Sequence, residues 1–297
     1  MKIKVSVIIP AYKDAENLER CLISLAKYKG DSTEIIVVDD GPFDEVVALA
    51  KKYPVNLIRS DKNRGAAYAR NAGARESSGS ILLYTDDDCV PMEKWAELLS
   101  NDLISSNSKD KDVVSVCGRV ISDNGYIEMA HSYSGYGYVQ KGERKYMEYI
   151  NSANFAVFKE AYLKVGGFSE DLTVSEDPEF ALKLCEAGYK IIFEPSISVY
   201  HNHGVDTFIK FIAKHKAWGK RLGNKMVSKH KNRYGFQAWV NQYPALMFLM
   251  IIPAAIATTV KIVFTNISYD IKVLFYAPAV FLSKVFFRWG MFIGSDK

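Results

Sequence analysis

The sequence contains few cysteines and none of the glycine-rich loops that cradle phosphate groups. No glycine-rich turn follows the first apolar run, and no GxxxxGK[S/T] motif is present, so a dinucleotide-binding dehydrogenase and a P-loop protein are excluded. The 297 residues include four cysteines without metal-type spacing, which predicts reduced thiols in a cytosolic environment. The cysteines are Cys21, Cys89, Cys117 and Cys185.

The sequence also lacks a secretory signal, an internal repeat and a low-complexity tract. The first apolar run is short and is interrupted by Pro10, so we expect the soluble part of the chain to face the cytoplasm. The net charge is only +4, but it is unevenly spread. Acidic residues are almost absent between Lys210 and Arg233, and the chain becomes strongly apolar from Pro244 onward.

The first 60 residues alternate between apolar strands and helices. Uniformly apolar strands joined by helices predict a parallel sheet that is covered on both faces. Pro10 is expected to close the first strand, because proline cannot continue a central strand. Strands are predicted at Lys4–Ile9, Glu34–Val38 and Val55–Ile58, with helices from Asp14 to a stop at Gly30 and from Asp44 to Lys52.

Acidic residues follow the strands of this predicted sheet. After an alanine-rich helix at Ala66–Glu76, a strand at Ser80–Tyr84 runs into Asp86, Asp87 and Asp88. Ligands of parallel α/β sheets bind beyond the carboxyl ends of the strands, where Pro10-Ala11-Tyr12 and Asp39-Asp40-Gly41 also lie. Asp86 and Asp88 alternate along an extended chain and offer the oxygen ligands that Mg²⁺ or Mn²⁺ prefers. Alone, such a triplet equally fits an acidic surface turn or a helix N-cap.

Five segments occur in an order that resembles the family 2 glycosyltransferases of GT-A fold. The resemblance covers about residues 1–205 and implies an α/β fold with a Rossmann-like, mostly parallel sheet and helices on both faces. It also implies a nucleotide diphosphate sugar as donor and Mn²⁺ or Mg²⁺ as cofactor. The segments are Val5–Tyr12, Ile36–Gly41, Asn63–Gly65, Ala69–Gly73 and Thr85–Asp88.

The resemblance also implies roles for individual residues. Asp39 would accept hydrogen bonds from the nucleotide base, and Arg70 would contact the diphosphate or hold the acidic residues. Asp86 would bind the ribose or the metal, and Asp88 would bind the metal. The predicted donor-binding residues are Pro10, Ala11, Tyr12, Asp39, Arg70, Asp86, Asp87 and Asn154, with Asp87 expected to be the more structural member of its triplet.

Glu176 and Asp177 open a predicted helix that stops at Gly188. Acidic residues in a first turn suit the helix dipole, and Ser175 would be the N-cap, so a purely structural interpretation is open. The resemblance instead makes this pair the catalytic motif, with Asp177 as the general base. Pro178 departs from the family pattern, although a first helical turn tolerates proline.

Polar side chains also follow the later predicted strands. Strands are expected at Val113–Ile121, Ile191–Phe193 and Ile197–Tyr200, and His201 follows the last of them, where a histidine is usually a polar cap. The resemblance implies instead that His201 completes the metal or diphosphate site. The segment Asn151–Phe158 resembles the one that lies beside the donor sugar in the family. A tyrosine-rich stretch follows residue 125 and serves in loop packing or as a sugar platform. Its tyrosines are Tyr126, Tyr133, Tyr136, Tyr138, Tyr146 and Tyr149.

The C-terminal part predicts contact with a membrane. A basic amphipathic helix within Phe208–Arg233 suits a membrane surface or a partner, and no nucleic-acid motif accompanies it. Pro244–Phe264 is expected to span a bilayer, and Ile271–Ile293, which carries more charge, is the weaker span of a hairpin. The alternative is that these helices pack on the soluble domain or on a second subunit of a homo-oligomer.

Together these observations predict an inverting, metal-dependent glycosyltransferase. It would act on a hydroxyl or lipid phosphate of a membrane-associated glycan or lipid, at the cell membrane with its catalytic domain in the cytoplasm. A cytoplasmic enzyme, a non-catalytic nucleotide-sugar-binding scaffold and a nucleotidyltransferase are the alternatives. The expected divisions are a catalytic domain at 1–205, interface helices at 206–240 and an apolar tail at 241–297.

Overall fold

The computed structural model describes residues 4–27, 30, 32–122, 125–136, 142–223 and 225–294. The chain divides into two compact units. The first comprises residues 1–121, 142–171 and 176–202, and the second comprises 122–141, 172–175 and 203–297. The second unit thus takes in residues 122–141, 172–175 and 203–205 from the predicted catalytic domain and joins the expected interface helices to the apolar tail.

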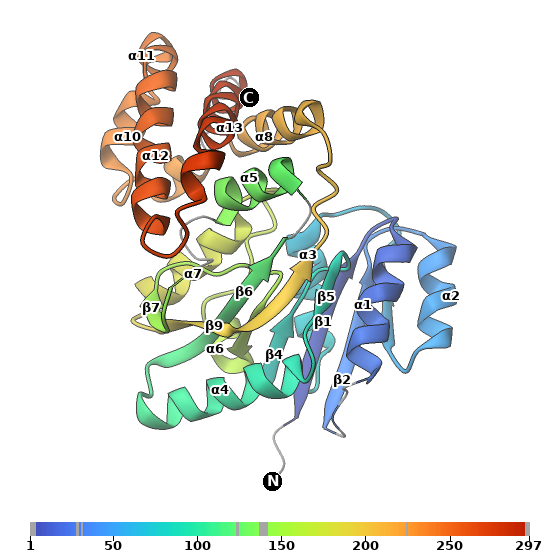
Figure 1. Ribbon diagram of the computed structural model, residues 1–297. Helices are drawn as coiled ribbons and strands as arrows, with labels where there is room; N and C mark the ends of the chain where they lie inside the picture. The colour runs from blue at the N-terminus through green and yellow to red at the C-terminus, as the bar shows by residue number, and fades with distance from the viewer. Residues whose placement is uncertain are drawn as a thin grey trace. The chain divides into compact units, whose positions relative to one another are not determined.

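The first unit contains a nine-stranded sheet in the order β3-β2-β1-β4-β8-β6-β9-β5, with β7 added beside β9 (Figure 1). The four N-terminal strands pair in parallel, as expected from their apolar sequences. In the second half β6 and β9 are parallel, whereas β8, β5 and β7 run antiparallel to their neighbours. The strands are β1 (Val5–Ala11), β2 (Thr33–Asp39), β3 (Asn56–Arg59), β4 (Ile81–Tyr84), β5 (Cys89–Pro91), β6 (Val113–Ile121), β7 (Lys145–Met147), β8 (Phe155–Phe158) and β9 (Lys190–His201).

Helices cover both faces of this sheet. Because side chains alternate along a strand, Val7 and Ile9 of β1 pack with α1 and α4 on one face, while Ile8 packs with α3 and α7 on the other. The α/β class predicted from the sequence is therefore confirmed. The helices of this unit are α1 (Ala15–Lys27), α2 (Asp44–Lys52), α3 (Ala66–Glu76), α4 (Trp95–Lys109), α6 (Lys159–Lys164) and α7 (Glu176–Glu186).

Two strand predictions were wrong in their limits. Strand β1 continues through Pro10, which pairs with Val38 of β2. The ladder between β1 and β4 ends earlier, at Ile8 and Tyr84, so the missing N–H of Pro10 disturbs no pairing on that side. The two strands expected at 191–193 and 197–200 are one strand, β9, whose register against β6 shifts between Glu194 and Ser198.

The second unit is helical. Its helices α8 and α13 cross closely because glycines lie at the crossing: a Cβ on Gly219 would lie 1.8 Å from the carbonyl oxygen of Phe287, and one on Gly290 would lie 2.1 Å from that of Lys216. The helices are α5 (Gly125–Tyr136), α8 (Phe208–Leu222), α9 (Lys225–Lys229), α10 (Gly235–Val240), α11 (Pro244–Leu249), α12 (Ile251–Asn266) and α13 (Val273–Gly294).

Of the two apolar segments, Pro244–Phe264 was expected to be the stronger candidate for a membrane span, but the structure favours the second segment. Residues 244–264 do not form one helix but are divided between α11 and α12, which begins anew because Pro253 has no N–H to continue the hydrogen bonds of α11. At 16 residues α12 is about 24 Å long, shorter than the roughly 30 Å core of a bilayer. Among the described residues, only α13 is long and apolar enough to cross a membrane.

A polar cluster lies inside the second unit. His131 Nδ1 is 3.1 Å from His215 Nε2, and the rings of both histidines contact Trp218. Burial, together with the charges of Lys284 and Lys214, lowers the pKa of His215 to about 3. Of the tyrosine-rich stretch, Tyr126 and Tyr133 lie on α5, while Tyr138 is outside the described residues.

Acid should therefore destabilise this unit through His215. Its pKa is lower in the folded state than in the unfolded chain, where it is about 6.5, so the unfolded state takes up the proton first as pH falls. Between pH 7.5 and 5.5 this linkage should remove about 1.4 kcal/mol from the free energy of unfolding.

Denaturant unfolding of wild type and His215→Gln at both pH values measures this effect. The glutamine does not titrate, so the variant should lose about 1.4 kcal/mol less than wild type over this range. The same loss in both proteins would show that His215 is not the group responsible.

Candidate active site

Asp39 ends β2 with its side chain buried in the first unit. Its Oδ2 atom accepts a hydrogen bond from the backbone N–H of Phe43 at 3.3 Å and lies 3.3 Å from Nε of Arg59. Its Oδ1 atom is buried and has no hydrogen-bond partner among the described residues. Burial raises the pKa of Asp39, although the Phe43 N–H and Arg59 oppose the shift. A buried acceptor without a donor is costly, so this oxygen is suited to a donor group on a ligand.

Two aromatic rings lie next to Asp39. The rings of Tyr12 and Phe43 meet edge to face with their centroids 5.1 Å apart, and Tyr12 is 42% exposed. Tyr12 belongs to the predicted donor-binding loop with Pro10 and Ala11, which are both part of β1. Phe43 was not predicted from the sequence. Its position, two residues after the Asp39-Asp40-Gly41 turn, is the signal that could have identified it.

Two other acidic residues near the carboxyl ends of the strands, Asp40 and Asp87, hold loops in place. This part of the sheet is called the carboxyl edge. Asp40 accepts hydrogen bonds from the backbone N–H groups of Arg64 at 2.9 Å and Gly65 at 2.7 Å. Asp87 accepts one from the N–H of Tyr12 at 3.1 Å. Burial and the charge of Asp88 raise the pKa of Asp87. These contacts fix the loops that follow β1 and precede α3.

Arg70 connects two acidic motifs that are far apart in the sequence. It lies on α3, and its side chain is 4% exposed. One guanidinium nitrogen, Nη2, lies 2.7 Å from Oδ1 of Asp86, and the other, Nη1, lies 2.9 Å from Oε1 of Glu176. Burial alone would lower the pKa of Arg70, but the charges of Asp86, Asp177 and Glu176 outweigh it and raise the pKa. The guanidinium thus joins the end of β4 to the start of α7.

The residues after Arg70 fix the helix that carries it. Asn71 donates to the carbonyl of Phe168 at 2.9 Å and accepts from its N–H at 3.0 Å. A Cβ on Gly73 would lie 2.4 Å from Cγ2 of Ile8, so glycine is needed where α3 packs on β1. These contacts give a physical reason for the Ala69-Arg70-Asn71-Ala72-Gly73 motif: they set the depth at which Arg70 enters the site.

Asp177 lies in the first turn of α7. Its Oδ2 atom accepts hydrogen bonds from the backbone N–H of Ser152 at 3.0 Å and from its hydroxyl at 2.9 Å. Burial and the charge of Glu176 raise the pKa of Asp177 to about 7, against the opposing effect of Arg70. A carboxylate with this pKa can accept a proton near neutral pH.

The start of α7 differs in one detail from the prediction. Pro178 lies in the first turn and is accommodated there, because first-turn N–H groups have no partner within the helix. Ser175, however, has a φ of +65°, whereas an N-cap residue is typically extended. The backbone at Ser175 therefore lacks the predicted N-cap geometry.

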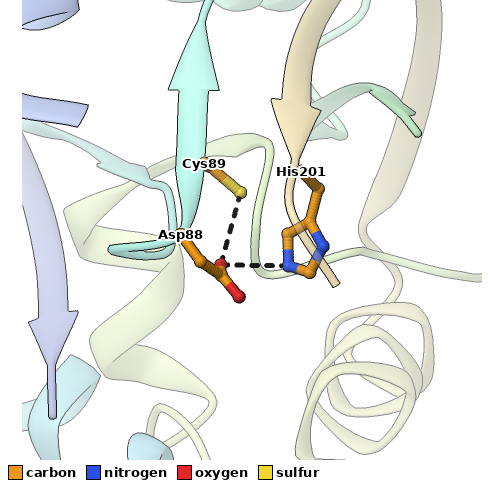
Figure 2. A group of neighbouring side chains, drawn as sticks. All are labelled: Asp88, Cys89 and His201. Carbon is orange, nitrogen blue, oxygen red and sulfur yellow. Dashed lines mark hydrogen bonds and ion pairs between the residues drawn. The ribbon is translucent and has the colours of Figure 1, made fainter. Parts of the chain in front are cut away.

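Asp88, Cys89 and His201 form a compact group at the pairing of β5 with β9 (Figure 2). Asp88 Oδ1 lies 3.1 Å from His201 Nε2 and 3.9 Å from Cys89 Sγ. The pairing of Cys89 with His201 in the antiparallel ladder brings these side chains together. Potential ligand atoms of all three lie within 4.8 Å of one another.

This donor set fits a divalent cation. A carboxylate oxygen and an imidazole nitrogen are suitable ligands for Mn²⁺, and the carboxylate also suits Mg²⁺. Burial and the charge of Asp88 raise the pKa of Cys89. Sulfur is a soft ligand that does not suit Mg²⁺ or Mn²⁺, so Cys89 is the least suitable ligand of the three. Asp86, also predicted as a ligand, is paired with Arg70 instead and lies outside this three-residue group.

The structure places Asn154, which was predicted to bind the donor, in the core of the first unit. Asn154 is fully buried, accepts a hydrogen bond from Trp95 Nε1 at 2.8 Å and donates to the carbonyls of Arg119 and Ile197. Its amide nitrogen would lie 2.4 Å from a Cβ on Gly118. Asn154 therefore stabilises the irregular pairing of β6 with β9, and it has no exposed group for a sugar.

Solved structures identify the fold as GT-A. The mannosyltransferase PcManGT from Pyrobaculum calidifontis, in complex with GDP-Man and Mn²⁺, superposes with a TM-score of 0.58. The superposition covers 96% of this chain and 86% of that one at 18% sequence identity. The sheet of the first unit, with acidic residues beyond its strand ends, thus has the GT-A fold.

Sequence comparisons define the family. The family model "Glycosyl transferase family 2" matches residues 6–167, and "Glycosyl transferase family group 2" matches residues 112–291. A protein of Haemophilus influenzae described as an uncharacterized glycosyltransferase is 32% identical over 71% of this chain and 69% of its own length. Glycosyltransferase AglE of Haloferax volcanii is 28% identical over 66% of each chain. The chain belongs to the family 2 glycosyltransferases.

Replacing Arg70 should destabilise the first unit strongly. Arg70→Met would leave Asp86 and Glu176 without their buried counter-charge, a change that typically costs about 3 kcal/mol or more. Denaturant unfolding monitored by circular dichroism measures the loss. In the double variant with Glu176→Gln the loss should be smaller, because one of the two unpaired charges is removed.

Arg75→Met is the matched control on the same helix. Arg75 lies 3.7 Å from Glu170, and both side chains are about half exposed, so this change should cost under about 1 kcal/mol. If Arg70→Met and Arg75→Met lowered the free energy of unfolding equally, the stabilising role of the Arg70 ion pairs would be contradicted.

Proposed function

We propose that this protein is an inverting glycosyltransferase that takes its sugar from a nucleotide diphosphate donor, requires a divalent cation and acts on a membrane-associated acceptor. The observation that carries the proposal is the double ion pair of Arg70. Arg70 contacts both Asp86, in the acidic motif after β4, and Glu176, at the start of α7, and so holds these two motifs together. The ion pairs support this proposal because they bring Glu176, the residue next to the proposed base Asp177, within reach of the same guanidinium as Asp86, a proposed donor-binding residue.

The donor base would lie against Tyr12 and Phe43, with Asp39 Oδ1 as its hydrogen-bond acceptor. This assignment rests on the buried acceptor without a partner and on the aromatic pair beside it. Arg59 keeps Asp39 in place from the other side. Buried polar atoms discriminate strongly between ligands, because a ligand without a matching donor leaves them unpaired.

The diphosphate would lie near Asp88 and His201. A divalent cation held by these two residues would neutralise the charge that develops on the leaving diphosphate. Asp86 is already paired with Arg70, so we assign it to orienting the donor ribose and the guanidinium rather than to binding the metal. Within the carboxyl edge, the three aspartates of the triplet would thus have three different roles.

Asp177 would accept the proton of the attacking hydroxyl. Ser152 fixes one of its oxygens through two hydrogen bonds, which leaves the other oxygen for the acceptor. Glu176 is held by Arg70 and would act by position and charge, since it raises the pKa of Asp177. Attack from the side of Asp177, opposite the leaving diphosphate, would invert the anomeric carbon.

A membrane-associated acceptor is supported by the second unit. Helix α8 carries Lys210, Lys214, Lys216, Lys220 and Arg221, and the 22-residue helix α13 is apolar except for a few polar residues, including the charged Lys284 and Arg288. Basic surfaces attract anionic lipids, while apolar helices favour the bilayer. A hydroxyl or phosphate of a lipid or lipid-linked glycan would therefore be presented at the membrane surface, with the enzyme on its cytoplasmic side.

The pH dependence of transfer tests the base. Because Asp177 accepts a proton only when it is ionised, kcat/KM should be constant above pH 7 and fall about tenfold per pH unit below it. The measurement uses the sugar donor that gives the fastest release of nucleoside diphosphate in a screen of UDP- and GDP-sugars. Asp177→Asn should lower kcat by about 10²–10⁴-fold with donor binding unchanged.

Ser152→Ala is the control for this assignment. It keeps the base but removes a hydroxyl that donates to the ionised carboxylate, so the inflection of the pH profile should move to higher pH. If Asp177→Asn retained the wild-type rate and the same inflection, another group would be the base.

Calorimetric titration with UDP and with GDP tests the metal site. Mn²⁺ should tighten binding of one nucleotide, EDTA should reverse this, and Asp88→Asn or His201→Gln should weaken the Mn²⁺ effect by at least about tenfold. Cys89→Ala should retain it, because a soft sulfur ligand does not suit Mn²⁺. An unchanged Mn²⁺ effect in Asp88→Asn would exclude this carboxylate.

A further inference from the structure

A cavity of about 150 Å³ lies within the second unit, among α10, α11, α12 and α13. It contains none of the residues assigned to the carboxyl edge, and the transfer reaction does not require it. Its size matters because an apolar protein cavity of about this volume accepts a benzene molecule. The space can therefore hold a segment of hydrocarbon chain.

Most of the cavity wall is apolar. Met247 of α11, Met250 between α11 and α12, and Met291 of α13 contribute to it. Methionine side chains adapt to flexible hydrocarbon because they are unbranched and polarisable. The small side chain of Ala254 lies on the wall contributed by α12. The apolar wall consists chiefly of Val240, Met247, Met250, Ile251, Ala254 and Met291.

The remaining wall is polar, with a positive charge. Arg288 of α13, Asn241 and Gln237 line it, and no Asp or Glu is among the described residues that do so. The Nδ2 atom of Asn241 is buried and has no hydrogen-bond partner within the described part of the chain. Arg288 lies with Nη2 3.4 Å from Oγ1 of Thr258 on α12. A guanidinium and an unsatisfied amide donor in one apolar cavity match an anionic group attached to a hydrocarbon chain.

The surrounding sequence has the same charge preference. No Asp or Glu occurs from Thr207 to Tyr269, and Asp270 is the only acid between Thr207 and Gly294. An anionic ligand therefore approaches helices whose charges are almost all positive.

We propose that this cavity binds one molecule of a lipid phosphate, with its phosphate at Arg288 and Asn241 and its chain along the methionine-lined wall. The occupant differs from the bilayer itself, because it binds in a defined cavity rather than along the outer surface of α12. That outer surface carries Ile252, Ile256, Val260 and Phe264 at intervals of four residues, and all four are exposed.

This proposal rests on the proposed function in one respect: it names a lipid that the membrane-associated enzyme binds. Binding is measured without any sugar donor, so the lipid site and the transfer reaction can fail independently.

The test uses the full chain in neutral maltoside micelles, titrated separately with dodecyl phosphate, dodecanol and inorganic phosphate. Native mass spectrometry counts the bound molecules. One dodecyl phosphate should bind per chain, and dodecanol and inorganic phosphate should each bind at least about tenfold more weakly, since each lacks half of the recognised chemistry. Equal binding of dodecanol, or of inorganic phosphate, would overturn the proposal.

Two variants with matched controls locate the site. Arg288→Gln should weaken dodecyl phosphate binding by at least about tenfold and leave dodecanol binding unchanged, whereas Lys261→Gln, an exposed charge on α12, should have no effect. Ala254→Leu fills the cavity and should prevent binding of both dodecyl compounds, whereas Ala257→Leu on the exposed side of the same helix should not. Wild-type binding by both Arg288→Gln and Ala254→Leu would refute the site.

Discussion

The buried guanidinium of Arg70 is the interaction on which the catalytic unit depends. Three carboxylates, Asp86, Glu176 and Asp177, act on it, and their charges maintain its protonation against the cost of burial. The dependence is mutual, since Asp86 and Glu176 would repel each other without the cation between them. A single side chain of α3 therefore allows acidic motifs ninety residues apart to occupy the same edge of the sheet.

The remaining acidic residues of this edge explain how a ligand site can be built without a glycine-rich phosphate loop. Asp40 and Asp87 accept hydrogen bonds from the backbone N–H groups of Gly65 and Tyr12, so the loops are held by carboxylates instead of being shaped around a phosphate. The edge consequently carries excess negative charge beside Asp88 and His201. This charge is the physical reason for proposing a divalent cation there, since a cation would be needed to hold a diphosphate beside it.

The sequence predicted the parts of this arrangement that depend on neighbouring residues. The helix predicted from Asp14 is α1, where Leu18, Cys21, Leu22 and Leu25 are buried at helical spacing and Asp14 accepts a hydrogen bond from the N–H of Asn17. The acidic residues after apolar runs predicted the acidic edge at the carboxyl ends of the strands. What it missed depends on distant partners. The burial of Asn154 requires Trp95 and the shifted register of β9, and Phe43 matters only because Tyr12 folds against it. The break before α12 had a local signal, Pro253, which the continuous apolar pattern obscured.

The environment of Asp177 shows how the same residues determine both stability and reactivity. Burial and Glu176 raise its pKa, whereas Arg70 and the Ser152 hydrogen bonds lower it. The resulting pKa is about 7. If Arg70 were farther away, the carboxylate would be protonated at neutral pH and could not accept a proton. If Asp177 were more exposed, its pKa would fall and it would be a weaker base. The packing of Gly73 against Ile8 sets the position of α3, and hence of Arg70, so a contact in the core beneath the site also controls the basicity of Asp177.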